Sequence, residues 1–139
     1  MASTAGPNYV LDKTYEVATG NTITGYQIVV GSTSTTCALP SDDASPYLGV
    51  AQLDPNEGVT LTAGNTVRVR MAGISKVQAG AAVSAFARVR ALGTLGLVDD
   101  ANPGTAADYF LGIALEAATQ LFDIITVDLT SKNTQYFTS

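Results

Sequence analysis

Two acidic pairs, Asp42-Asp43 and Asp99-Asp100, are the side chains whose type and spacing first suggest chemistry. Carboxylates in polar loops are typical ligands of calcium, which takes six to eight oxygen ligands in proteins. Asp also favours turns, because its side chain bonds the backbone near it. Neither pair carries the spaced, glycine-containing ligand pattern of a calcium loop. The sequence therefore favours two turns and leaves calcium binding as the open alternative.

The residues of the common catalytic centres are scarce. The chain has no histidine, which removes the usual general base and the usual partner of a nucleophile. Its single cysteine, Cys37, forms neither an internal disulfide nor a thiolate zinc site. Ser75 and Lys76 are adjacent, and neighbours on a strand point to opposite faces. We expect no enzyme, no cofactor and no small-molecule substrate, although an all-carboxylate hydrolytic site stays open.

Two arginine pairs concentrate positive charge in an acidic chain. Arg68 with Arg70, and Arg88 with Arg90, have the i, i+2 spacing that places both side chains on one face of a strand. One interpretation is a solvated strand face with carboxylate partners on the next strand. The other is an interface with a second protein, because the planar guanidinium makes several directed bonds. We include all four arginines in a candidate partner interface.

Short β-segments separated by turns position these residues. Alternating or β-branched runs occupy 9–17, 23–30, 47–53, 66–71, 85–90, 110–116 and 123–129. Roughly ten strands with turns every 8–12 residues are typical of a sandwich or small barrel. Residues 117–120 offer at most the start of a short helix. The prediction is an all-β fold, a single small β-barrel or β-sandwich domain with little helix.

The chain repeats one motif. Asp-Asp-Ala, then Ser or Asn with Pro, leads to Leu-Gly-Val-Ala at 48–51 and to Leu-Gly-Ile-Ala at 111–114. The spacing is close to half the chain, so we predict two pseudo-repeated halves. In each half the motif glycine, Gly49 or Gly112, allows close packing of a buried strand.

The two ends differ from the body. We predict a flexible arm at 1–8, the β domain at 9–129 and a polar tail at 130–139, with neither a signal peptide nor a membrane span. Net charge is −5, so binding to nucleic acid is not expected. Only 14% of residues are charged, which suits a protein packed against others. The arms and the first residue of the β domain add five candidate interface residues: Pro7, Asn8, Tyr9, Tyr136 and Phe137.

Four segments, in their order, resemble the capsid decoration (cement) proteins of tailed bacteriophages. They are 73–83, 95–98, 111–118 and 124–129, and the resemblance covers about 20–129. It implies a small β-barrel protein, often a homotrimer, that binds the major capsid protein on the outer surface of the virion capsid. It also implies that the protein stabilises the capsid by bridging neighbouring capsomers, is made in the host cytoplasm and has no catalytic residues.

The sequence departs from that family in its long loop at 99–108, in its polar tail, and in Phe86 with two arginines after Val83. Another structural β-domain of a phage, from a tail, fibre or baseplate, is the main alternative. A lipoyl- or biotinyl-carrier barrel is less favoured, because it needs a modified lysine at a hairpin tip. Lys76 instead lies within a Val/Ile-rich segment.

Overall fold

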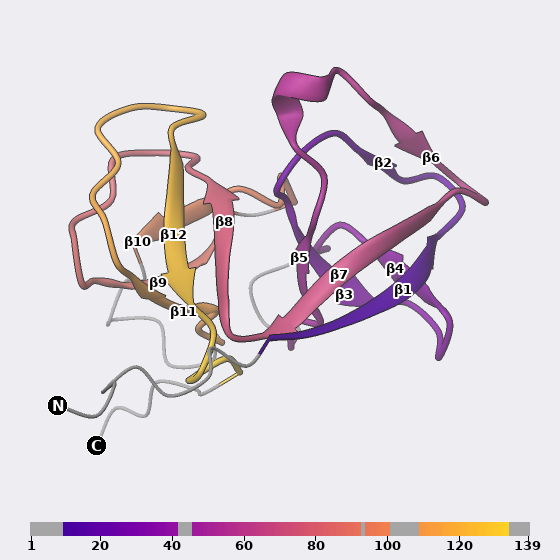
Figure 1. Cartoon of the computed structure of the whole chain (residues 1–139), viewed down its shortest axis with the longest axis horizontal. Helices are drawn as coiled ribbons and strands as arrows, with labels where there is room; N and C mark the ends of the chain where they lie inside the picture. The colour runs from indigo at the N-terminus through magenta and orange to yellow at the C-terminus, as the bar shows by residue number, and fades with distance from the viewer. Residues whose placement is uncertain (1–9, 42–45, 93, 101–108, 134–139) are drawn as a thin grey trace, which may run out of the picture.

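The computed structural model describes residues 10–41, 46–92, 94–100 and 109–133. The fold is all-β, as predicted, and consists of two five-stranded units that lie side by side (Figure 1). The helical segment in the described residues is a 3-10 turn, η1 (Pro55–Glu57). It occupies a predicted turn, begins with Asp54 capping the amide of Asn56, and ends at Gly58 with a φ of 69°.

The first unit, which we call barrel 1, is a closed barrel in the order β1-β4-β3-β5-β7. Its strands are β1 (Leu11–Val17), β3 (Ile28–Gly31), β4 (Thr36–Ala38), β5 (Gly49–Ala51) and β7 (Thr66–Ala72). A small pair beside it consists of β2 (Thr22–Ile23) and β6 (Leu61–Thr62). The alternation predicted for β7 is confirmed, since Val67 and Val69 are buried and Arg68 is exposed.

The second unit, which we call barrel 2 for its likeness to the first, is a five-stranded sheet in the order β10-β9-β11-β12-β8. Its strands are β8 (Ile74–Gln78), β9 (Arg88–Ala91), β10 (Val98–Asp100), β11 (Gly112–Ala114) and β12 (Ile124–Asp128). One parallel bridge between Ala79 and Val98 joins the two edge strands. Ile125, Val127 and Leu129 are buried, as the alternation predicts.

The predicted repeat of two halves is confirmed at the level of individual hydrogen bonds. The strands β1, β3, β4, β5 and β7 correspond in order to β8, β9, β10, β11 and β12. In barrel 1 the amide of Ala18 donates to the carbonyl of Cys37 at 2.9 Å, and in barrel 2 Gly80 donates to Val98 at 2.7 Å. Both bonds accompany the parallel pairing that closes the ring of strands.

The motif glycines permit the same close approach in both barrels, as predicted. A Cβ atom added at Gly49 would overlap the carbonyl oxygen of Arg70, and one added at Gly112 would overlap that of Asp128. Gly49 lies on β5, which pairs with β7, and Gly112 lies on β11, which pairs with β12. Any larger residue would push these strands apart.

A shared hydrophobic cluster joins the two barrels. Barrel 1 has its own cluster around Tyr15, Val29 and Val69. The cluster of barrel 2 also takes in Ile28 and Val50 from barrel 1, so that the barrels are packed together.

Two predicted elements differ from the structure. The predicted strand at 23–30 is split, because Gly25 packs tightly against the Gln78 side chain and its carbonyl accepts a bond from the Gln27 amide at 2.7 Å. The segment 117–120 is not a helix, since Ala118 pairs with Val83 in an antiparallel bridge. The described part of the chain holds no helix with the length and apolar character needed to span a bilayer.

Candidate partner interface

Arg68 and Arg70 share one carboxylate on the neighbouring strand. Arg70 donates to Asp12 from Nε at 2.9 Å and from Nη2 at 3.1 Å, and Arg68 Nε lies 3.3 Å from the same carboxylate. The hydrogen bond from Arg70 lowers the pKa of Asp12, and Asp12 raises the pKa of Arg70. The cross-strand interpretation is therefore confirmed for this pair, although the Arg68 side chain remains 62% exposed.

Arg88 and Arg90 occupy a different place in the repeat. They lie on β9, whereas Arg68 and Arg70 lie on β7, so the two pairs are not copies of each other. The guanidinium of Arg88 lies 5.1 Å from the ring centre of Phe110, in a cation–π contact. Arg88 is exposed, while Arg90 is half-buried and stands opposite Asp99 in the ladder. Their role as interface residues stays a prediction.

Several predicted sites lie outside the described residues: Pro7, Asn8, Tyr9, Asp42, Asp43, Tyr136 and Phe137. Asp99 and Asp100 lie in strand β10 and not in the predicted turn. Asp99 Oδ1 accepts from the Asp100 amide at 2.8 Å, and Asp100 Oδ1 accepts from the Ser84 amide at 3.3 Å. Among the described residues, no three acidic, Cys or His side chains converge as metal ligands would.

The other candidate side chains have structural surroundings. Ser75 is buried while Lys76 is exposed, which confirms that they point to opposite faces. Ser75 Oγ accepts a bond from the Gln52 side chain at 2.8 Å. Cys37 is fully buried in barrel 1, and this burial raises the pKa of its thiol. A thiol in such surroundings is protonated and shielded from reactants.

Sequence reasoning missed two exposed phenylalanines with an unusual backbone. Phe86 has a φ of 67° and is 74% exposed, and Phe122 has a φ of 68° and is 60% exposed. Each occupies the third position of a turn that a backbone hydrogen bond closes, from Ala87 to Ser84 and from Asp123 to Gln120. A positive φ is a genuine outlier for a bulky residue and is favoured by glycine. Such strain often marks a functional position.

The repeat shows what is special about Phe122. The amide of Phe122 donates to the carbonyl of Ala79 at 2.7 Å, and in barrel 1 the amide of Gly64 donates to Val17 at 3.1 Å. Gly64, the equivalent residue, has a φ of 88°. Barrel 2 therefore has a phenylalanine at a position of positive φ, where barrel 1 has the glycine that this backbone favours. An alignment of the turn 62–65 with 120–123 is the sequence signal that would have found it.

The residue before Phe122 is a second exposed apolar side chain, Leu121. We call Leu121 and Phe122 the apolar tip; both are exposed. The carboxylate of Asp123 holds the turn in shape, because it accepts from the amide and hydroxyl of Thr119 and from the amide of Gln120. The amide of Thr119 contributes most to a lowered pKa of Asp123. The tip is thus a hydrogen-bonded turn with an apolar end.

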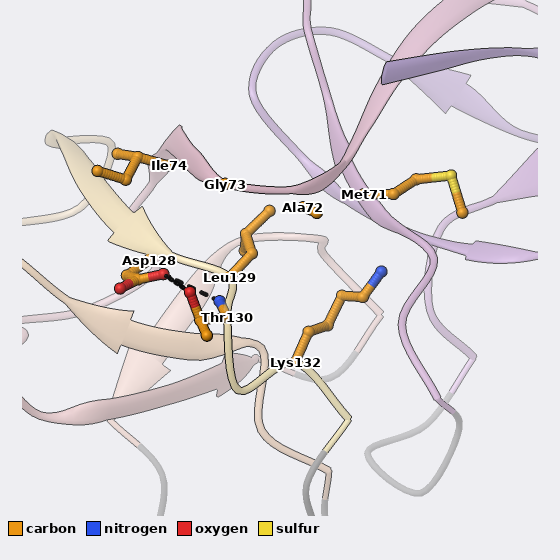
Figure 2. A pocket seen from close by; sticks show the side chains of 8 residues that line it. All are labelled: Met71, Ala72, Gly73, Ile74, Asp128, Leu129, Thr130 and Lys132. Carbon is orange, nitrogen blue, oxygen red and sulfur yellow. Dashed lines mark hydrogen bonds between the residues drawn. The ribbon is translucent and has the colours of Figure 1, made fainter. Parts of the chain in front are cut away.

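A hollow lies where the chain crosses from barrel 1 to barrel 2 (Figure 2). It measures about 580 Å³ and is lined by Met71, Ala72, Gly73, Ile74, Asp128, Leu129, Thr130 and Lys132. The Lys132 side chain reaches across to barrel 1, where Nζ donates to the carbonyl of Leu48 at 2.6 Å. Burial lowers the pKa of Lys132. Its amine fastens the C-terminal segment to barrel 1.

The geometry defines an all-β protein of a closed barrel and a repeated five-stranded unit, whose unusual features are exposed apolar side chains. Neither a scan against protein-family models nor a search of curated proteins finds a match to the chain. Among solved structures, it is similar to the N base of the head fibre protein gp8.5 of bacteriophage phi29, with a TM-score of 0.60. The match has 16% sequence identity and covers 91% of this chain and 98% of that chain. It shows a shared fold.

Proposed function

We propose that this chain is a structural protein of a bacteriophage virion that binds the outer surface of the assembled capsid and stabilises it by bridging neighbouring capsomers. The observation that carries the proposal is the fold: nearly the whole chain aligns with the base of a phage head fibre protein. The sequence resemblance to capsid decoration proteins points to the same class of virion component. A homotrimer that binds the major capsid protein, with no catalytic activity, is part of the proposal.

The apolar tip supports a role in protein contacts. Aromatic side chains that enter a pocket contribute most of the binding energy at many interfaces. Leu121 and Phe122 are presented on a turn that Asp123 fixes, so that little conformational freedom is lost on binding. The charged residue of the turn, Asp123, is acidic, which disfavours an anionic membrane as the target. The tip therefore suits an apolar pocket on a capsid protein.

The two arms would extend the contact. Weak contacts from several linked copies add up through a high effective concentration. An arm that becomes ordered on the capsid covers a large area, although ordering it costs entropy. Deletion of residues 1–8 is expected to lower occupancy on the capsid and to leave the thermal unfolding of the β domain unchanged. Unchanged occupancy would remove the N-terminal arm from the interface.

Another virion component is the second candidate. The solved neighbour is described as a head fibre protein, which favours a fibre base over a tail or baseplate component. Electron microscopy of virions with a gold-labelled chain separates these possibilities. Label distributed over the whole head supports a decoration protein, label confined to projecting fibres supports a fibre base, and label on the tail contradicts both.

Binding to purified capsids tests the proposed function directly. The full chain is mixed with capsids of its own phage from which surface proteins have been stripped, and the bound fraction is measured by co-sedimentation. Wild-type chain is expected to sediment with the capsids and to raise their disruption temperature. Phe122→Gly keeps the turn geometry and removes the ring, so its binding should fall by about tenfold or more, as for an aromatic anchor. No sedimentation of the wild type would contradict the proposal.

A further inference from the structure

A smaller pocket, of about 260 Å³, lies between barrel 1 and barrel 2. Barrel 1 contributes Tyr26, Gln52 and Arg70 to its lining, and barrel 2 contributes Thr126 and residues of β8. The lining contains two cations, Arg70 and Lys76, and no acidic side chain. One water takes up roughly 30 Å³ in the liquid, so the pocket has room for a small anionic group with waters around it.

Arg70 keeps two N–H hydrogens for a ligand. A guanidinium has five N–H donors. Three of them are used, since Nε and Nη2 donate to Asp12 and Nη1 donates to the carbonyl of Ile74 at 3.1 Å. One hydrogen on each Nη atom therefore has no acceptor among the described residues. Two neighbouring nitrogens of a guanidinium fit the two oxygens of a carboxylate.

Two further donor groups of the lining are without an acceptor in the described part of the chain. The exposed ammonium of Lys76 forms no ion pair there, and the hydroxyl of the half-buried Tyr26 makes no hydrogen bond there. Lys76 lies on β8 of barrel 2, whereas Tyr26 precedes β3 of barrel 1. The two barrels therefore supply donors to one pocket, and no carboxylate of the lining competes for them.

Neutral side chains fix the wall of the pocket. The Gln52 side chain donates to the carbonyl of Val50 at 3.1 Å and, across to barrel 2, to Ser75 Oγ at 2.8 Å. Ser75 Oγ in turn donates to the carbonyl of Lys76 at 2.9 Å. Because these bonds exist without a ligand, little conformational freedom is lost when one binds.

The charge around the pocket suits an anion with a single negative charge. Arg70 and Lys76 supply two positive charges, and Asp12, which is bonded to Arg70, cancels one of them. Outside the lining, the exposed side chains of Arg68 and Glu116 have opposite signs. A carboxylate matches the one remaining charge, whereas a phosphate group carries about −1.5 to −2 at neutral pH.

We propose that this pocket binds a carboxylate group, which accepts hydrogen bonds from the two remaining Nη hydrogens of Arg70 and from the ammonium of Lys76. The carboxylate belongs either to a small carboxylic acid or to an acidic side chain of a neighbouring protein, and the chemistry of binding is the same for both. Since its donors lie on both barrels, the ligand also ties the barrels together. The inference does not depend on capsid binding.

Acetate is the first probe. The isotope-labelled full chain is titrated with sodium acetate in place of sodium chloride at constant ionic strength. Nuclear magnetic resonance follows the Nε–H signal of Arg70 and the backbone amides of Ser75 and Lys76. These signals are expected to shift and to reach saturation together. Shifts that grow linearly with acetate, without saturation, would overturn the proposal.

Lys76→Met is the main variant, with Lys13→Met as its matched control. Both changes remove one positive charge from an exposed lysine on a strand, but Lys13 lies on β1 and does not line the pocket. The affinity for acetate should fall about threefold in Lys76→Met, as for an exposed ion pair, and should be unchanged in Lys13→Met. Equal weakening by both variants would contradict a site at the pocket.

Glu116→Gln should change the affinity in the opposite direction. The hydroxyl of Thr126, which lines the pocket, donates to Glu116 at 2.8 Å, and the amide oxygen of glutamine can accept the same bond. The variant therefore keeps the wall and removes a negative charge near the pocket. Acetate should bind up to about twofold more tightly, because this charge is exposed and screened. Weaker binding would contradict the electrostatic argument.

Capsids distinguish the two sources of the carboxylate. Stripped capsids are sedimented with the wild type, Lys76→Met and Lys13→Met, in chloride and in acetate. Binding that is lost in acetate and in Lys76→Met alone supports an acidic side chain of the capsid as the ligand. Capsid binding that is unaffected, with saturable acetate binding, supports a free carboxylic acid. Saturable acetate binding by a chain that does not sediment with capsids would support this inference and defeat the proposed function.

Discussion

Barrel 1 and barrel 2 share one hydrogen-bond framework but differ in the side chains that project from it. On β1 and β7, Asp12 stands opposite Arg70, and the two form an ion pair. The equivalent positions on β8 and β12 hold Ile74 and Asp128, and Asp128 bonds Thr130 instead. Inward residues and glycines therefore set the register, while outward residues are free to serve different contacts.

The largest expected effect comes from substituting the motif glycines, which both barrels share. Gly112→Ala and Gly49→Ala each drive a Cβ atom into a backbone carbonyl, so each should lower the free energy of unfolding by ~3 kcal/mol or more. Urea unfolding of the full chain measures this. Gly31→Ala is the control, because its Cβ would meet no atom within 4 Å. A large loss at one motif glycine alone would show that the two barrels are not built alike.

A smaller effect comes from removing the ion pair between Asp12 and Arg70, which barrel 2 lacks at the equivalent positions. Asp12→Asn replaces the carboxylate that Arg70 binds through two nitrogens, and it should cost about 1–2 kcal/mol of unfolding free energy. Ile74→Asn, at the equivalent place in barrel 2, breaks no ion pair and is the matched comparison. An equal loss from both variants would mean that the ion pair contributes nothing of its own.

The same carboxylate predicts a dependence on pH. Arg70 lowers the pKa of Asp12 below its ordinary value of 3.8, so the folded state holds this proton less tightly than the unfolded state. The resulting stability is present above pH 3.8 and is lost as the pH falls through the lower pKa of the folded state. As the pH falls through this range, the free energy of unfolding should therefore decrease more for the wild type than for Asp12→Asn. Acid titration of both proteins measures this difference. Parallel curves for both proteins would contradict the assignment.

The repeat and its glycines could be predicted from the sequence, because they are encoded in local order. The spacing of Leu-Gly-x-Ala and the alternation in 66–71 and 123–129 depend on residue type alone. The contact between barrels could not be predicted, since nothing local distinguishes the buried Gln78 from the exposed Glu16 at the equivalent place. Nor could the backbone of Phe86 and Phe122, because a turn with positive φ is usually recognised by its glycine.

The smallest effect, and the most direct test of the difference between the barrels, is at the equivalent turns. Phe122→Gly should raise the free energy of unfolding by up to about 1 kcal/mol, because glycine adopts a φ of 68° without steric cost. Gly64→Ala, at the same turn of barrel 1, should lower it by about the same amount, since its φ is 88° and a Cβ there meets no other atom. Thermal unfolding of both variants measures the two signs. Opposite signs, together with reduced capsid binding by Phe122→Gly alone, would show that barrel 2 keeps a strained turn for the sake of its aromatic side chain. A loss of stability in Phe122→Gly would instead mean that the ring stabilises the folded chain. That result would contradict the assignment of the tip as a contact surface.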